Sequence, residues 1–170
     1  DRERQILRTR IVSMIRDESA SSQLAAATAL IVTPVEAWPG VIVREHPFGG
    51  TAFFLGTREF GHVHRSGLLD VNYNRSVRDA LVAAGRTGRH SVHPESGWTS
   101  YRIRGPGDVD GAVWLLRLSY LATAITLSRT QTGRRALASF DLDAELDALD
   151  APAPVTERYR QRARNLGLAA

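Results

Sequence analysis

The feature that most constrains the fold is a run of short apolar segments between residues 41 and 73, separated by turns. The segments are rich in β-branched and aromatic residues, and they span residues 41–46, 51–55, 59–64 and 68–73. Segments of this kind are typical of strands, and glycine-containing turns this short join antiparallel neighbours. Apolar and polar residues also alternate over residues 98–104, as in a strand. The sequence therefore predicts an antiparallel β-meander with a later strand.

Helical patterns surround these strands. Asn74 is suited to cap a helix over residues 75–84, and Asp108 precedes a long helix that is apolar almost all round. Before the strands, helices are expected at residues 4–16 and 23–31, with a short turn of helix from Thr33. After them, helices are expected at residues 134–149 and 155–166, joined by a linker at residues 151–154.

This order predicts an α+β fold, in which helices pack on one face of an antiparallel sheet and extra helices lie at both termini. We divide the chain into an N-terminal helical segment (1–37), an α+β core (38–130) and a C-terminal helical appendage (131–170).

Composition excludes several function classes. The 170-residue chain has no cysteine, which excludes disulfides and thiolate chemistry. No signal peptide or membrane-spanning run is present, so we expect a cytoplasmic protein without a membrane partner. The net charge is +4, but the arginines are spread among 18 acidic residues, which makes a nucleic-acid partner unlikely.

Four of the five histidines lie between residues 62 and 93. On a regular strand, Phe60, His62 and His64 would share one face and Glu59 would point to the other. Asp70, on the next strand, could meet the histidines across the ladder. Three interpretations stay open from the pattern alone: structural histidines, a metal site and a metal-free catalytic site.

The metal interpretation rests on the His-x-His spacing, which offers two imidazoles to one ion. His90 could supply a third ligand from the loop that follows the helix at residues 75–84, so the alternative cofactor is a divalent metal ion held by His62, His64 and His90.

Several motifs in order resemble the luciferase-domain family. They are Arg58-Glu59-Phe60-Gly61-His62-Val63-His64, then Ser66-Gly67-Leu68, then Arg89-His90, and then a strand and a Leu-rich helix. The resemblance covers about residues 38–121 and is closest to bacterial, actinobacterial-type members. The chain departs from the fungal pattern at Leu69 and Asp70, where a further histidine is expected, and at residues 86–88, which lack the expected tryptophan.

The resemblance implies an enzyme that uses molecular oxygen on a small enolic or aromatic substrate, without an organic cofactor. His62, His64 and His90 match the motif and are the expected catalytic residues. One of the first two would be the base, because histidine titrates near neutral pH. The residues expected to bind the substrate are Arg58, Phe60, Asp70, His93, Glu95, Trp98, Tyr101 and Arg102.

A non-catalytic binding or assembly module is the remaining hypothesis. The Arg-rich terminal helices motivate it, and they could also join copies of the chain into a homo-oligomer.

Overall fold

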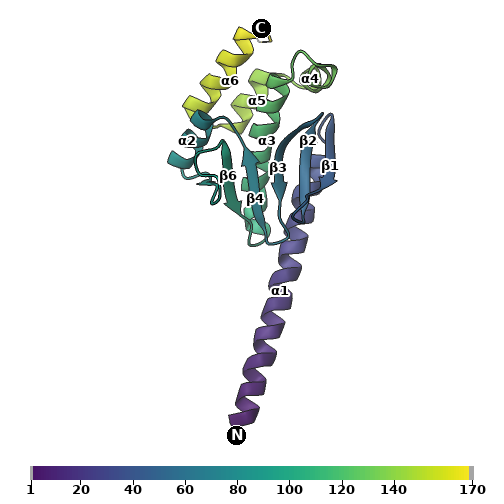
Figure 1. Cartoon of the computed structure of the whole chain (residues 1–170), viewed down its shortest axis with the longest axis vertical. Coiled ribbons are helices and arrows are strands. Elements are labelled where there is room, and N and C mark those ends of the chain that lie inside the picture. Colours follow the sequence, from purple (N-terminus) through teal and green to yellow (C-terminus); the bar gives the residue numbers. More distant parts are fainter. Residues whose placement is uncertain (1, 169–170) are drawn as a thin grey trace.

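Four consecutive strands form the meander that the sequence predicts (Figure 1). The structure, a computed structural model, describes residues 2–168. Each strand pairs antiparallel with the one before it, and the four are β1 (Val41–Glu45), β2 (Thr51–Leu55), β3 (Arg58–Val63) and β4 (Leu68–Asn72). The turn between β1 and β2 requires glycine at position 50, where φ is +104° and a Cβ atom would lie 2.1 Å from the Val63 carbonyl oxygen.

Two later strands complete the sheet. β6 (Trp98–Arg102) pairs with β4, and the two-residue β5 (Gly88–Arg89) pairs with β6, which gives the order β1-β2-β3-β4-β6-β5. All the pairs are antiparallel, so the predicted α+β class is confirmed. β5 was predicted to be part of a loop, because two residues are too few to show a pattern of alternation.

A β-bulge in β3 changes which side chains share a face. Phe53 of β2 pairs with Gly61 and Phe54 pairs with Glu59, so Phe60 is an extra residue with no partner in β2. Phe60 is fully buried on the helix-covered face. There its ring packs against the aromatic rings of Trp38, Phe53 and Tyr120.

The bulge makes two predictions about this strand wrong. Phe60 does not share a face with His62 and His64, and Glu59 does not point away from them. With one extra residue between them, Glu59 and His62 project from the same face and contact each other, although they are three positions apart.

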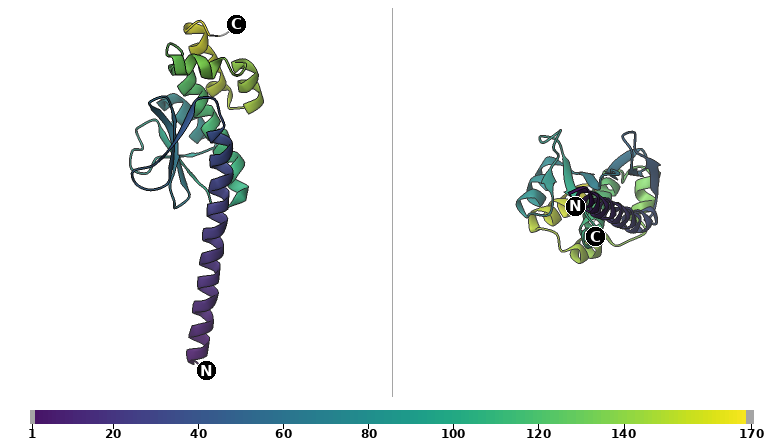
Figure 2. Two further views of the ribbon diagram at one scale, coloured as in Figure 1. Left: turned by 90° about the vertical axis from the view of Figure 1, so that its right-hand side faces the viewer. Right: turned by 90° about the horizontal axis from the view of Figure 1, so that it is seen from below.

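Helices cover one face of the sheet (Figure 2). The long apolar helix α3 (Val109–Thr126) packs directly against the central strands, and its buried side chains include Leu115, Leu116 and Leu121. The C-terminal part of α1 (Arg2–Glu36) packs against α3 and also contacts β1 and β2. The sheet, α1 and the C-terminal helices together bury α3 on several sides, which explains why it is apolar almost all round.

The N-terminal segment is one helix and not the two helices and a turn that the sequence predicts. Ser22 and Thr33, expected to start new helices, lie inside α1, because the burial of Ala27, Ile31 and Val35 holds this part of the helix together. Residues 2–23 are all exposed, and α1 extends away from the rest of the molecule (Figure 1).

The helix α2 (Arg75–Ala83) follows its sequence signals closely. The Asn74 side chain accepts a hydrogen bond from the Val77 N–H at 2.9 Å, and Gly85 has a φ of +69° after the last turn.

The C-terminal segment contains three helices that pack on the core. The predicted helix over residues 134–149 is divided into α4 (Gln131–Leu137) and α5 (Leu142–Leu149), because Asp141 caps a new start by accepting from the Ala144 N–H. The predicted linker is short, since α6 (Ala153–Asn165) begins within it. Tyr159 of α6 is buried and donates a hydrogen bond to the Leu118 carbonyl oxygen of α3.

Among residues 2–168, none of the helices combines the length and the apolar composition that crossing a bilayer requires.

Candidate functional site

The open face of the sheet carries the histidine pair. His62 of β3 and Asp70 of β4 are direct cross-strand partners, and His64 projects from the same face two residues further along. Ser100 of β6 is in turn the partner of Asp70. The regular pairing of three strands therefore brings an imidazole, a carboxylate and a hydroxyl into one row.

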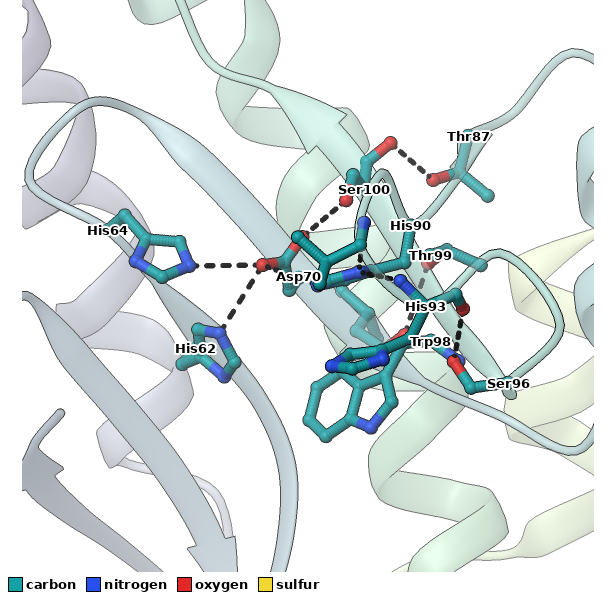
Figure 3. Close-up of polar contacts among 12 residues, drawn as sticks. His62, His64, Asp70, Thr87, His90, His93, Ser96, Trp98, Thr99 and Ser100 are labelled. Carbon is teal, nitrogen blue, oxygen red and sulfur yellow. Dashed lines mark hydrogen bonds and ion pairs between the residues drawn. The ribbon is translucent and has the colours of Figure 1, made fainter. Parts of the chain in front are cut away.

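Asp70 is the centre of this cluster (Figure 3). Its Oδ2 atom lies 3.0 Å from Nε2 of His64, 3.4 Å from Nε2 of His62 and 3.4 Å from Nε2 of His90. Its Oδ1 atom accepts a hydrogen bond from the Ser100 hydroxyl. The prediction that Asp70 meets the histidines across the ladder is thus confirmed.

Asp70 is ionised in this environment, although it is only 1% exposed. Burial is the largest influence and would raise the pKa of Asp70. The hydrogen bonds from His62, Ser100 and His64 outweigh burial and hold the pKa well below its usual range.

His62 is clamped between two carboxylates. Its Nδ1 atom is hydrogen-bonded to Glu59 Oε1, and its Nε2 atom faces Asp70. Burial is the largest influence on the pKa of His62 and lowers it, but the hydrogen bonds and charges of the two carboxylates outweigh it and raise the pKa to about 9. His62 is therefore a fixed cation at neutral pH and cannot be the general base.

His64 has a different arrangement. Its Nε2 atom pairs with Asp70, while its Nδ1 atom has no hydrogen-bond partner among residues 2–168. In the neutral imidazole, this contact requires the proton to be on Nε2, which donates a hydrogen bond to Asp70. The lone pair on Nδ1 is then left free to accept a proton.

His90 enters the cluster from the loop after β5. Its Nδ1 atom accepts hydrogen bonds from the backbone N–H groups of Val92 and His93, at 3.1 and 3.0 Å. Neutral His90 therefore carries its proton on Nε2 and directs it at Asp70. The ring of His93 stacks on that of His90, with centroids 5.4 Å apart.

His46, the fifth histidine, also belongs to the site, although the sequence did not indicate it. It follows β1, and its ring stacks on that of His62 with centroids 3.9 Å apart. Burial, and then the charge of His62, lowers the pKa of His46, so this ring is neutral beside a charged one. Strand register could have indicated its position. His46 pairs with Gly50 across the β1–β2 turn, and Gly50 lies beside His64 on the neighbouring strand.

All five histidines line one cavity of about 460 Å³ on the open face of the sheet. Phe48 and Val92 form exposed apolar parts of its rim, and Trp98 forms a wall with its ring 5.3 Å from that of His62. The lining residues are His46, Phe48, His62, His64, Leu68, Asp70, His90, Ser91, Val92, His93 and Trp98.

Five residues that the sequence placed near the substrate lie elsewhere. Phe60 and Tyr101 project from the helix-covered face, where Tyr101 packs against Gly111 of α3. The Arg102 guanidinium donates to the Ser66 carbonyl oxygen, and Glu95 is exposed in its loop. Arg58 lines a different cavity. These residues are separated from the histidines by strand alternation, by the bulge or by distance along the sheet.

A group of three histidines has the spacing of a metal site. One ring nitrogen from each of His46, His62 and His64 lies within 4.8 Å of the others. The Glu59 carboxylate is hydrogen-bonded to Nδ1 of His62, and metal-bound imidazoles usually have such a carboxylate on the ring nitrogen that does not bind the metal. The arrangement can thus serve either as a proton-transfer network or as a three-nitrogen ligand set.

Part of the chain, which includes most of the cluster, matches the model of a known family. Residues 57–119 match the family model described as the luciferase domain, so the resemblance seen in the sequence is confirmed over this stretch. The match includes His62, His64, Asp70 and His90, whereas His46 lies before it. Neither the search of curated proteins nor the search of solved structures found a match to the chain.

Proposed function

We propose that this chain, whose residues 57–119 match the luciferase domain, is an enzyme that oxidises a small enolic or aromatic molecule with molecular oxygen. The observation that carries the proposal is the shared carboxylate: Asp70 orients His64, His62 and His90 at the wall of one open cavity. In this arrangement, the charged imidazole of His62 and the imidazole of His64, with its free Nδ1 lone pair, line the same cavity.

The cavity suits a small ring-shaped substrate. A volume of about 460 Å³ falls within the range that small-molecule sites usually have. The Trp98 ring offers a flat apolar wall, and the Phe48 ring lies at the rim. A planar enol or phenol could stack on these rings while its hydroxyl group points to the histidines.

The first step is the removal of the substrate's hydroxyl proton. We assign this role to Nδ1 of His64, because Asp70 holds the opposite nitrogen and stabilises the imidazolium that forms. The charged His62 then stabilises the enolate, since its cation is fixed in place by Glu59 and Asp70 before the reaction begins.

The second step is the reaction of the enolate with oxygen. The electron-rich carbon forms a bond to one oxygen atom, so the carbon is oxidised and O₂ is reduced to a peroxide anion. The proton on His64 returns to the peroxide, which leaves a hydroperoxide and regenerates the neutral base. No other oxidant or reductant is needed for this step.

Oxygen consumption tests the proposal directly. The purified chain is mixed with a panel of hydroxypyrones and catechols, and an oxygen electrode records uptake in the presence of a chelator. We expect at least one compound to be consumed, and His64→Ala to slow uptake by about 100-fold or more. Glu95→Gln is the matched control, because Glu95 lies outside the cavity. Equal rates in the wild-type chain and in His64→Ala would exclude His64 as the base.

A second candidate function is a divalent metal centre, and the cluster of His46, His62 and His64 favours it. The ionised carboxylates of Glu59 and Asp70 flank this group, while His62 supplies one compensating proton. A divalent cation in place of that proton would balance both carboxylates.

Elemental analysis of protein purified without a histidine tag distinguishes the two candidates. A metal centre requires stoichiometric metal, either as purified or after reconstitution, and its loss in His46→Ala. His93→Ala is the control, since His93 lines the same cavity outside the three-histidine group. A wild-type chain that retains no metal after reconstitution rules this candidate out.

A further inference from the structure

The helix α6 lies near one end of the sheet (Figure 1), and residues of both line a second cavity. It has a volume of about 330 Å³ and is formed by the start of β3, the end of β4, and the helices α3 and α6. Its polar lining comes mainly from Arg58, Asn72, Asn74, Arg158 and Arg162. None of these residues lines the histidine cavity, so the two sites are distinct.

The charge of this second cavity is strongly positive. Arg58, Arg158 and Arg162 face it, and the one carboxylate in the lining, Glu59, is already hydrogen-bonded to His62. Within residues 2–168, none of the three arginines has a carboxylate oxygen within 4.0 Å.

The two other arginines of α6 differ from Arg158 and Arg162, because both have carboxylate partners. Arg160 pairs with Asp143 at 2.9 Å and with Asp147 at 2.6 Å, and Arg164 pairs with Glu157 at 2.8 Å. The arginines that α6 directs away from the second cavity are therefore neutralised within the chain, whereas the two that it directs into the cavity are not.

The position of α6 is fixed by packing. Arg158 and Arg162 are four residues apart, which places them on the same face of the helix. Tyr159 between them is only 2% exposed and donates a hydrogen bond to the Leu118 carbonyl oxygen at 3.0 Å. Arg162 itself donates to the Thr126 hydroxyl at 3.3 Å, which holds it at the rim.

Further hydrogen-bonding groups lie in the same space. Asn72 ends β4, and Asn74 caps α2, so the positive end of that helix dipole also lies at the cavity. Guanidinium groups bind phosphate and carboxylate oxygens in pairs, with charge-assisted hydrogen bonds.

We propose that this second cavity, lined by Arg58, Arg158 and Arg162, is a binding site for an oxyanion group, either phosphate or carboxylate, of a small ligand. Two guanidinium groups from one face of α6 and a third from β3 surround the anion. Because all three arginines are exposed, the interaction is screened by solvent, and an isolated anion binds weakly.

Calorimetry and amide chemical-shift mapping test this site with pyrophosphate and with malonate, each at constant ionic strength in a buffer free of phosphate. We expect saturable binding of at least one anion, with shifts confined to residues 58–59, 72–75 and 158–162. The double variant Arg158→Gln/Arg162→Gln should weaken that binding by about 10-fold or more, since two charge-assisted contacts are lost. Arg160→Gln/Arg164→Gln is the matched control, because it also removes two positive charges from α6, at positions outside the cavity.

The two anions identify the ligand class. Tighter binding of pyrophosphate assigns the site to a phosphate, and tighter binding of malonate assigns it to a carboxylate; either result supports an oxyanion site. The proposal is overturned if neither anion binds, or if Arg160→Gln/Arg164→Gln weakens binding as much as Arg158→Gln/Arg162→Gln does. The second result would indicate general attraction to a basic surface.

Discussion

At the scale of single residues, Asp70 holds the histidine cluster together. One oxygen of its buried carboxylate faces three imidazoles, and the other accepts a hydrogen bond from the Ser100 hydroxyl. Each of these partners is positioned by a different strand or loop, so the carboxylate joins elements that are distant in the sequence. This dependence can be tested through stability as well as through activity.

Asp70→Asn should destabilise the fold by about 3 kcal/mol, because it removes the negative charge opposite the buried His62 cation. Chemical denaturation measures the change. Ser100→Ala is the comparison, since it removes a single hydrogen bond to Asp70 and should cost about 1 kcal/mol. A loss below about 0.5 kcal/mol for Asp70→Asn would mean that the cluster does not depend on this charge.

The pH dependence of stability should show the titration of His62. Its pKa is about 9 in the folded chain against 6.5 for an unperturbed histidine, so the charged form is favoured by folding. The resulting stabilisation is fully present below pH 6.5 and is lost as the pH rises through 9. It amounts to on the order of 3 kcal/mol.

Denaturation between pH 6 and pH 10 with a chelator present measures this effect, and His62→Gln should flatten the slope in that range. A slope that persists in His62→Gln would assign the effect to another group. Asp70 contributes with the opposite dependence, because its depressed pKa gives stability that is present above 3.8, the pKa of an unperturbed aspartate, and is lost as the pH falls below it.

At the scale of secondary-structure elements, the turn between β1 and β2 decides how closely the histidines approach. The centroids of the His46 and His64 rings are 5.3 Å apart, and Gly50 lies in the turn beside them. A side chain at this position would meet the Val63 carbonyl oxygen at 2.1 Å and would also require an unfavourable φ.

Gly50→Ala should therefore destabilise the chain by about 3 kcal/mol or more, from backbone strain and a steric clash together. Thermal and chemical unfolding measure the loss. Gly85→Ala separates the two contributions, because Gly85 also has a positive φ but has nothing within 4 Å of a Cβ atom. Its cost should be about 1 kcal/mol. Equal costs at the two positions would show that the turn can relax.

The two parts of α1 should contribute very differently to stability. Residues 2–23 are exposed along their whole length, whereas Ile31 is fully buried against the core. Removal of residues 1–20 should change the free energy of unfolding by less than about 0.5 kcal/mol. Ile31→Ala should cost about 3 kcal/mol by leaving a cavity. A large loss on truncation would mean that the exposed part of α1 has a partner in solution.

At the scale of the whole molecule, the C-terminal helices complete the core. The segment that the sequence divides off as a C-terminal helical appendage packs on the core over the residues that the structure describes, 131–168. Val155, Tyr159 and Ala163 of α6 are buried together with Leu146 of α5. The same helix carries two of the three arginines of the proposed oxyanion site, Arg158 and Arg162, so the packing of α6 also positions these charges.

Removal of residues 153–170 should abolish cooperative folding, because it uncovers several buried side chains, each worth about 2 kcal/mol or more. Circular dichroism during heating measures the transition. Tyr159→Ala is a milder change that should cost about 3 kcal/mol while the chain still folds. A truncated chain with an unchanged melting temperature would show that α6 is a dispensable appendage.

The partners that the sequence predicts for the whole molecule stay predictions. A homo-oligomer through the terminal helices, a small-molecule substrate and molecular oxygen all follow from the sequence and the resemblance. The exposed apolar side chains of α1, among them Leu7, Ile11 and Met14, give the first of these a concrete location.

The sequence by itself determined the features that depend on neighbouring residues. Turn glycines and alternating side chains were enough for the four strands of the meander, and Asn74 and Gly85 were enough for the ends of α2. The pairing of His62 with Asp70 was within reach for the same reason, because a short turn sets the register of two adjacent strands.

Only the tertiary structure decided the features that depend on contacts between distant segments. The bulge at Phe60 reverses the faces of Phe60 and Glu59, and it exists because Phe60 fits among Trp38, Phe53 and Tyr120. His46 joins the cluster through strand register, and α1 continues through Thr33 because its inner side chains are buried. In each case the free energy of packing outweighs a local preference, and packing partners far along the chain cannot be read from local sequence.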